Sequence, residues 1–391
     1  MPSESTMRYG CNPNQSTARF YMRQGGQLPL KILNGAPSYI NLMDALNAWP
    51  LVRELNRTLS LPAAASFKHV SPAGAAVSVP LSEELAASYF VDDLELSPLA
   101  TAYARARGAD RLASFGDWVA LSDVVDVPTA RIIKREVSDG VIAPGYEPEA
   151  LALLKGKKGG SYPIFKIDPD YEPAALESRE VYGITLEQTR NDFMPDSDFF
   201  SHVVSKRSNL SAEAKRDLTV ATIAVKYTQS NSVTLALDGQ VIGSGAGQQS
   251  RVHCVRLACS KADNWYLRQH PRVRDMQFQQ RVRRAERVNA IDIYLQEEAT
   301  PAELTTWEAN FTQVPERLSA EEQRSWLDGL QGVALSSDAF FPFRDNIDRA
   351  SRSGVEYVVQ AGGSVRDDAV IEAADEYGML MINSGVRLFH H

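Results

Sequence analysis

Apolar stretches alternate with short polar turns along the chain and predict alternating strands and helices. An apolar run from Leu61 to Ala65 predicts a buried strand. Lys68 and His69 follow it, and we expect Ser71 to Gly74 to stop the strand and turn the chain. Strand ends beside tight turns are where α/β proteins place their chemistry. Lys68 and His69 are therefore candidate site residues, with a surface Lys–His pair at a capped strand end as the alternative.

Helical spacing of apolar residues predicts helices between such strands. Residues 40–56 predict a short helix that Pro50 breaks. Residues 112–123 are typical of a strand–turn–helix edge, with the turn at Phe115 to Asp117. The same reasoning predicts helices over residues 93–107 and 128–137, and strands over residues 139–146 and 220–225.

The second half of the chain repeats features of the first half. The apolar run 220–225 ends at Lys226, like a degenerate copy of the strand that ends at Lys68. Residues 334–338 echo residues 120–123, and residues 357–363 echo residues 140–145. We infer an internal duplication of a β-α-β unit, which divides the chain into residues 1–185 and 186–391.

The second copy is longer than the first. Lys68 and Phe115 are 47 residues apart, whereas Lys226 and Phe340 are 114 apart, so the second copy holds an insertion of 67 residues. The charged, helical stretch at about 263–330 fits this insertion. Its segment 272–287 carries six arginines, which favours a solvated face or a dimer arm over a polyanion site.

Composition limits the class of protein. Hydrophobic residues make up 44% and charged residues 23% of the 391, as in ordinary globular proteins, and the length suits two domains. A net charge of −8 does not favour nucleic acid or anionic membrane as a partner, and no apolar run is long enough to span a membrane. Three cysteines (Cys11, Cys254 and Cys259) without a Cys-x-x-Cys pair predict neither disulfides nor zinc, so we expect a cytoplasmic protein.

Two further segments could bind anions. The loop from Arg8 to Gln15 begins with a guanidinium next to the Tyr9 ring, which suits a phosphate and a flat ring, unless it is an arm that packs on the body. A hairpin turn at Asp238-Gly239 precedes Gly243 to Gly247, and a helix carrying Arg251 follows. This order suits an anion at the helix start, with a tight strand–helix turn as the alternative.

Eight motifs, in order, resemble one family. The first half has Arg-Tyr-Gly-x-Asn-Pro-x-Gln from Arg8, Lys-His-Val-Ser-Pro-Ala-Gly from Lys68, Ser-Phe-Gly-Asp-x-Val-Ala-Leu-Ser-Asp from Ser114, and Asp-Gly-Val-Ile-Ala-Pro-Gly-Tyr from Asp139. The second half has Lys-Tyr-Thr-Gln-Ser-Asn-Ser-Val from Lys226, Gly-Ala-Gly-Gln-Gln-Ser-Arg from Gly245, Ser-Asp-Ala-Phe-Phe-Pro-Phe-Arg-Asp-Asn from Ser337, and Arg-Leu-Phe-His-His from Arg387. From Arg8 to His391 the sequence resembles the aminoimidazole carboxamide ribonucleotide (AICAR) transformylase portion of the bifunctional purine-biosynthesis enzymes.

The resemblance implies a fold and a reaction. The fold is α/β, with two duplicated cytidine-deaminase-like α/β/α units, a helical insertion in the second, and a homodimer with active sites at its interface. The reaction transfers the formyl group of 10-formyltetrahydrofolate to the 5-amino group of AICAR, which gives formyl-AICAR and tetrahydrofolate. Only seven residues precede Arg8, so we expect no inosine monophosphate (IMP) cyclohydrolase activity. Asn14 stands where the family usually has histidine.

The resemblance also implies roles for particular residues. Catalysis would rest on Lys68, His69 and Asn231. The residues implied to bind AICAR are Arg8, Tyr9, Lys68, His69, Arg251, Arg387 and Phe389. The residues implied to line the folate side are Phe115, Asp139, Phe340, Asp345 and Asn346. A monovalent cation, potassium, is implied near Val225, Thr228, Ser230, Asp338 and Leu388.

Two other functions are alternatives to the formyl transfer. A zinc deaminase shares the implied fold, but it needs His-x-Glu and Pro-Cys-x-x-Cys motifs, which the sequence lacks. A non-catalytic AICAR-binding regulatory protein is the second alternative. Intact Lys68, His69 and Asn231 favour the enzyme.

Overall fold

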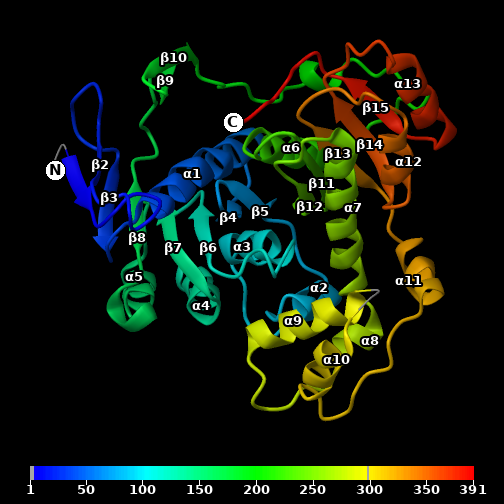
Figure 1. Cartoon of the computed structure of the whole chain (residues 1–391), viewed down its shortest axis with the longest axis horizontal. Coiled ribbons are helices and arrows are strands. Elements are labelled where there is room, and N and C mark those ends of the chain that lie inside the picture. The colour runs from blue at the N-terminus through cyan, green and yellow to red at the C-terminus, as the bar shows by residue number, and fades with distance from the viewer. Residues whose placement is uncertain (1–3, 297–298) are drawn as a thin grey trace.

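A mixed sheet of 11 strands forms the centre of the molecule (Figure 1), which a computed structural model describes for residues 4–296 and 299–391. In sheet order the strands are β15 (Leu380–Asn383), β14 (Val355–Gln360), β13 (Val333–Ser337), β11 (Val233–Leu237), β12 (Gln240–Gly245), β5 (Ser71–Val77), β4 (Ala63–Lys68), β6 (Asp117–Leu121), β7 (Ser138–Ala143), β8 (Ile164–Ile167) and β3 (Leu30–Asn34).

The two halves of this sheet have the same order of connections. In each half an antiparallel hairpin (β4–β5, β11–β12) is followed by three mutually parallel strands (β6–β7–β8, β13–β14–β15). The halves meet where β12 runs antiparallel to β5, with Gln240 opposite Ala76. The helices of the first half are α1 (Tyr39–Leu59), α3 (Pro98–Gly108), α4 (Val127–Arg135) and α5 (Pro148–Lys155), and those in corresponding places of the second half are α6 (Ala212–Lys226), α7 (Arg251–Leu267), α12 (Asp345–Ser351) and α13 (Asp367–Glu376).

Helices cover both faces of the sheet and make three layers (Figure 1). Successive strand residues point to opposite faces, so Trp118 and Ala120 of β6 join one core and Val119 and Leu121 the other. Helices α1 and α6 fill the first core, and α3, α4, α5, α7, α12 and α13 fill the second. The protein is therefore a mixed α/β structure built on one large sheet.

Smaller elements surround this body. Helices α8 (Pro271–Arg274), α9 (Arg284–Leu295), α10 (Pro301–Glu308) and α11 (Ala320–Leu327) follow α7 and largely share a core of their own, so this stretch is helical as expected. The remaining elements are the hairpin β1 (Glu4–Met7) and β2 (Ala18–Tyr21), α2 (Glu83–Ser88), the 3-10 turns η1 (Lys157–Gly160) and η2 (Asp198–Phe200), and the ribbon β9 (Leu176–Val181) and β10 (Ile184–Thr189). In the described residues, no helix is long and apolar enough to cross a membrane.

The prediction of a strand at 220–225 is wrong, because these residues belong to α6. Every residue from Asp217 to Lys226 is buried, so the helix lacks the polar face that would have revealed its period. Lys226 is therefore not a copy of Lys68. Its ammonium binds the Glu54 carboxylate of α1 at 2.8 and 3.0 Å, and the Tyr227 hydroxyl donates to the same carboxylate at 2.8 Å.

Three other local predictions are wrong. Pro50 does not break its helix, since α1 continues for 21 residues and packs on β4 and β6. The chain turns at His69 and Val70, whose φ angles are 54° and 58°, and Ser71 already belongs to β5. A two-residue turn with both φ angles positive matches the twist of the flanking strands. Residues 117–121 form strand β6 and not a helix.

Candidate functional site

The predicted site residues of the two halves lie along one edge of the sheet, which we call the site edge. Lys68 ends β4, and Phe115 precedes β6, which runs antiparallel to β4. Asn231 precedes β11, and Arg251 follows β12. Because β5 and β12 are antiparallel neighbours, the start of β5, the end of β12 and the start of β11 all lie at this edge.

The carboxylate of Asp44 stabilises the Lys68–His69 turn through a hydrogen bond to its backbone. The Asp44 Oδ1 of α1 accepts the backbone N–H of Val70 at 2.7 Å. Burial raises the pKa of Asp44, against the lowering effects of the Val70 N–H and of His69. A β-branched residue with positive φ is strained, and such strain persists only where neighbouring groups enforce it. Asp44 thus supports the turn. Sequence reasoning missed it, although an acid between buried Leu42 and Ala45 was a signal.

Three predicted residues of the first half adjoin one another. The Lys68 Nζ donates to the Phe115 carbonyl at 2.6 Å, and the Phe115 ring is 48% exposed. Gly116, which has a φ of 78°, is a neighbour of Asp139. A Cβ atom added to Gly116 would lie 3.9 Å from the Asp139 Oδ2, which is an ordinary contact distance. Asp139 in turn pairs with Lys158 at 2.8 Å. His69 itself is exposed. The site edge here offers an ammonium, an imidazole, an aromatic ring and a carboxylate.

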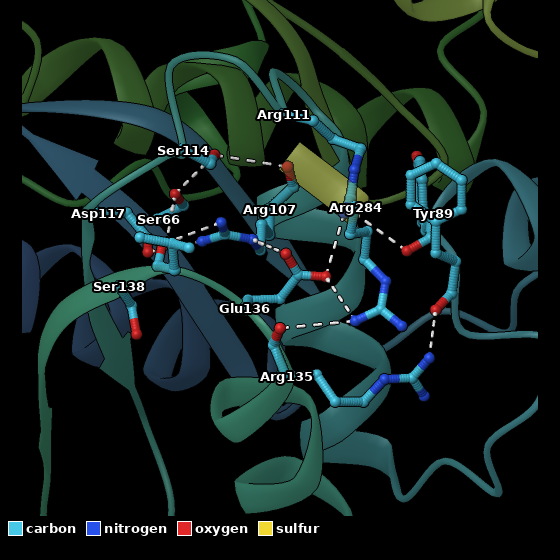
Figure 2. Close-up of polar contacts among 12 residues, drawn as sticks. Ser66, Tyr89, Arg107, Arg111, Ser114, Asp117, Arg135, Glu136, Ser138 and Arg284 are labelled. Carbon is cyan, nitrogen blue, oxygen red and sulfur yellow. Dashed lines mark hydrogen bonds and ion pairs between the residues drawn. The ribbon is translucent and has the colours of Figure 1, made fainter. Parts of the chain in front are cut away.

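A buried ionic network fixes the segment that carries Phe115 (Figure 2). Arg107 pairs with Asp117 at 2.6 Å, and Asp117 also accepts the Ser66 hydroxyl at 2.7 Å. Glu136 binds Arg107 at 3.3 Å and Arg111 at 3.1 Å. Burial would raise the pKa of Glu136, but the two guanidinium groups lower it. Because Arg107 and Arg111 precede the turn into β6 and Asp117 follows it, the network fixes both sides of the turn that carries Phe115.

Asn231, Arg251 and Asp338 form the centre of the second half of the site edge. The Arg251 Nη1 binds the Asp338 Oδ1 and the Ser232 carbonyl, and its Nη2 donates to the Asn231 Oδ1 at 2.9 Å. The Asn231 Nδ2 donates to the Gln249 carbonyl at 3.2 Å. The Asn231 amide is therefore oriented, with its oxygen toward Arg251 and its NH₂ group on the other side. The predicted helix start is confirmed, since α7 begins at Arg251.

The C-terminal segment lies against the same loop. The Leu388 N–H donates to the Asp338 carbonyl at 2.8 Å, and the Ser230 N–H donates to the His390 carbonyl at 3.0 Å. Arg387 and Phe389 are exposed, and the Arg387 guanidinium lies 4.8 Å from the centre of the Phe389 ring. An exposed guanidinium over an aromatic ring can bind a phosphate and a flat base together.

The residues implied for potassium also come together here. The Val225 carbonyl accepts the Thr228 N–H at 3.0 Å and the Ser232 hydroxyl at 3.4 Å, and the Asp338 carbonyl accepts Leu388. The candidate ligand atoms for the cation are mainly carbonyl and hydroxyl oxygens, which suit a hard cation. Arg251 neutralises the Asp338 carboxylate. The set fits a monovalent ion. In the part of the chain that is described, no three His, Cys, Asp or Glu side chains form a metal cluster.

The remaining predicted folate residues lie beyond β13. Phe340 is 42% exposed, Asp345 opens α12, and buried Asn346 donates to the Asp345 Oδ1 at 2.9 Å. In the sheet, β13 and β6 are five strand positions apart, or about 24 Å at about 4.8 Å per position. One chain therefore does not bring Phe340 to Phe115.

Arg8 and Tyr9 lie apart from the other predicted nucleotide residues. They follow β1, whose hairpin packs through Met7 and Phe20 on the core near β3, at the opposite end of the molecule from β13–β15 (Figure 1). The Arg8 guanidinium is exposed and lies 5.8 Å from the centre of the Tyr9 ring. Within one chain, the predicted AICAR residues thus form three groups, at the N-terminal hairpin, the Lys68–His69 turn and the Arg251 loop.

Comparison with known proteins agrees with the motifs. The family described as AICARFT/IMPCHase bienzyme matches residues 1–261. The bifunctional purine biosynthesis protein PurH of Myxococcus xanthus is 31% identical over 394 residues, which cover 98% of this chain and 60% of that protein. PurH of Bartonella bacilliformis is 32% identical over 391 residues, which cover 99% of this chain and 59% of that protein. The chain spans about three fifths of the length of these curated relatives.

Proposed function

Because the chain belongs to the AICARFT/IMPCHase bienzyme family, we propose that it is the formyltransferase of purine biosynthesis that acts on AICAR. It transfers the formyl group of 10-formyltetrahydrofolate to the 5-amino group of AICAR, and the products are formyl-AICAR and tetrahydrofolate. The observation that carries this proposal is the shared site edge. The Ser71 hydroxyl, next to the Lys68–His69 turn, accepts the Gln229 N–H at 3.2 Å, two residues before Asn231.

The chemical difficulty lies in the amine. Its lone pair is delocalised into the imidazole ring and the carboxamide, so it attacks the formyl carbon poorly. It must lose a proton as that carbon becomes tetrahedral, and the folate nitrogen must gain one as it leaves. A neutral imidazole can accept the first proton, and His69 is exposed at the tip of a supported turn.

Two further groups could stabilise the negative charge that develops on the formyl oxygen during the transfer. Lys68 carries an ammonium at the site edge, where it now donates to the Phe115 carbonyl. The Asn231 amide keeps an N–H available, because Arg251 holds its oxygen and Gln249 takes only one N–H. Hydrogen-bond donors that are oriented before the reaction stabilise an oxyanion most effectively.

The nucleotide and the folate would use the remaining predicted residues. Arg251, Arg387 and Arg8 suit the phosphate, and Tyr9 and Phe389 suit the flat base. Phe115 and Phe340 offer exposed rings to the pterin, with Asp139, Asp345 and Asn346 beside them. A bound potassium ion would hold the loop 228–232 against the C-terminal segment.

The separation of the predicted groups favours a homodimer with composite sites. Phe115 precedes β6 and Phe340 follows β13, and these strands are about 24 Å apart along the sheet, which is far for one folate to bridge within one chain. The β9–β10 ribbon supports the same proposal, because all residues of both strands are exposed, including Leu176, Val181 and Ile184. Isolated two-stranded ribbons are marginally stable in water, and a second subunit would cover this one. The division at residue 185 into two duplicated cytidine-deaminase-like units stays part of this proposal.

An assay with both substrates tests the function. Purified protein is mixed with AICAR and 10-formyltetrahydrofolate, and tetrahydrofolate is followed by absorbance while formyl-AICAR and IMP are separated by chromatography. We expect formyl-AICAR to accumulate. AICAR binding in calorimetry without any turnover would favour the regulatory protein instead. IMP formation at an enzymatic rate would contradict the expectation that this chain carries only the transfer.

A further inference from the structure

An arginine-lined cavity lies between the first half of the chain and the helical insertion. It has a volume of about 270 Å³, and its walls come from the end of α2, the turn after α3, the end of α7, and helices α8 and α9. Figure 1 shows α2, α8 and α9 gathered below the sheet. We call it the arginine cavity, and its arginines are Arg111, Arg268, Arg274 and Arg287. None of the residues predicted for the formyl transfer lines it.

Two of these arginines have buried nitrogen atoms without partners. Arg268 is 8% exposed, and its Nη1 is buried with no hydrogen-bond partner among the described residues. Arg111 is 7% exposed, and its Nε is also buried with no hydrogen-bond partner among the described residues. Native proteins pair nearly all buried polar groups, so an exception indicates a missing water, ion or ligand. The described residues hold 14 such atoms, and these two lie in one cavity, where an anion would give both a partner.

The charge of the cavity supports an anionic ligand. Arg111 is paired with Glu136 at 3.1 Å, and the other three arginines face one acidic lining residue, Asp92, in a protein whose net charge is −8. Of the acids near Arg268, Asp110 pairs with Lys261 at 3.1 Å, whereas Asp292 accepts only from the neutral Gln296 amide at 2.8 Å and compensates part of the Arg268 charge. The cavity therefore keeps a local excess of positive charge, which makes an anion favourable there.

Aromatic rings in the wall narrow the class of ligand. The Arg111 guanidinium lies 4.8 Å from the centre of the Phe90 ring, and the Arg287 guanidinium lies 5.4 Å from that of Phe278. Guanidinium groups bind phosphate in a bidentate manner, and ring faces pack on flat heterocycles. The volume lies just below the usual range for small-molecule sites, which suits a mononucleotide better than a dinucleotide.

We propose that the arginine cavity is a second ligand site that binds a nucleoside monophosphate. This goes beyond the formyl transfer and does not depend on it. It also assigns part of the arginine-rich segment 272–287, because Arg274 and Arg287 line the cavity, whereas Arg272 pairs with Glu322 at 2.7 Å on the surface. Arg111 lies four residues before Phe115, so a ligand here would contact the segment that leads to the site edge.

Calorimetry with adenosine monophosphate tests the proposal. Adenosine and inorganic phosphate serve as separate probes, and hydrogen exchange locates the bound nucleotide. We expect the monophosphate to bind and to protect residues 83–92 and 268–291. Each partial probe should bind at least about 10-fold more weakly, since it lacks either the charge-assisted hydrogen bonds or the ring contacts. Phosphate binding as tightly as the nucleotide would reduce the cavity to an adventitious anion site and overturn the assignment.

Variants localise the site. Arg268→Ala should weaken binding at least about 10-fold, because it removes charge-assisted hydrogen bonds to the phosphate. Arg283→Ala, which removes an exposed arginine next to α9, should leave binding unchanged. Arg268→Ala should keep the wild-type formyl-transfer rate without the nucleotide, and Arg268→Lys, which keeps the charge and most of the buried side chain, should bind with intermediate affinity. Unchanged nucleotide affinity in Arg268→Ala would overturn the proposal, whatever the outcome of the transfer assay.

Discussion

The hydroxyl oxygen of Ser71 accepts a hydrogen bond of 3.2 Å from the backbone N–H of Gln229. Ser71 is opposite Lys68 in the β4–β5 hairpin, and Gln229 begins the loop that carries Asn231. This bond therefore joins the two halves of the site edge within one chain. We propose that the active site forms at this junction, and whether each site uses one subunit or two can be measured directly.

Mixing two inactive variants tests the composite site. Lys68→Ala, beside Phe115, and Asp345→Ala, beyond β13 like Phe340, remove one predicted group from each of the two separated regions, and each homodimer should lose most of its activity. If every site takes its two halves from different subunits, refolding an equal mixture should restore about a quarter of the wild-type activity, because half of the dimers are mixed and each has one intact site. Activity that stays absent in the mixture would place both groups in one subunit. Mixing either variant with itself is the control.

The imidazole of His69 should matter for turnover and little for affinity. His69→Ala should lower kcat by about 10²-fold or more, because the amine loses its proton acceptor. The affinity for AICAR in calorimetry should stay nearly unchanged, as should the melting temperature, since His69 is exposed. His202→Ala, which removes an exposed histidine near β15, is the matched control. A wild-type rate in His69→Ala would remove this residue from the mechanism.

Asp44 should act as a positioning residue for the Lys68–His69 turn. Asp44→Ala leaves the Val70 N–H without its acceptor, so kcat should fall about 10-fold through misplacement of the turn. Asp44→Asn keeps an acceptor oxygen and should restore most of the rate at similar stability. KM for AICAR should change little in both variants. Equal loss of rate in the two variants would mean that the carboxylate charge, and not the hydrogen bond, is what matters.

The Glu54–Lys226 pair should stabilise the contact between α1 and α6 as a unit. Both side chains are nearly buried, so Glu54→Ala leaves an unpaired ammonium and should cost about 3–5 kcal/mol in the free energy of unfolding. The double variant Glu54→Leu with Lys226→Met removes both charges and should cost less than either single truncation. Denaturant unfolding measures all of them. A double variant as unstable as the sum of the single ones would contradict the coupling.

Lys157 should make stability depend on pH. Burial lowers the pKa of Lys157 to about 8 from 10.5, and its ammonium contacts the Glu136 carbonyl. Between these two values the unfolded chain holds a proton that the folded chain has released, so stability rises with pH across this window. The burial cost is fully present below pH 8.

A comparison with Lys157→Met isolates this effect. The variant should gain melting temperature relative to wild type at pH 7.5, and the gain should shrink toward pH 10. Lys206→Met, which changes a largely exposed lysine, should show no such trend. A difference between Lys157→Met and wild type that is constant with pH would show that Lys157 does not titrate in this range.

The sequence predicted the local structure well where a few consecutive residues constrain the backbone. The strand before Lys68, the loop after Arg8, the hairpin turn at Asp238 and the helix at Arg251 were all predicted correctly. In each case the signal is local, since an apolar run, a glycine or a proline constrains the backbone over a few residues.

The errors arise where burial hides the pattern. Helix α6 is buried on all sides from Asp217 to Lys226, so its sequence there resembles that of a buried strand. Helix α1 continues through Pro50 because its packing compensates for one lost hydrogen bond. The sequence did not predict the roles of Asp44, Glu54 and Arg268, because the role of a charged residue depends on partners that are distant in the chain.

By itself, the sequence determined which chemical groups the protein carries and in what order, because motifs are written in consecutive residues. Only the tertiary structure decided that Lys68 and Asn231 share one edge, that the strands beside Phe115 and Phe340 are five positions apart in the sheet, and that four arginines line one cavity. Such relationships depend on strand order and helix packing, which bring together residues that are distant in the chain.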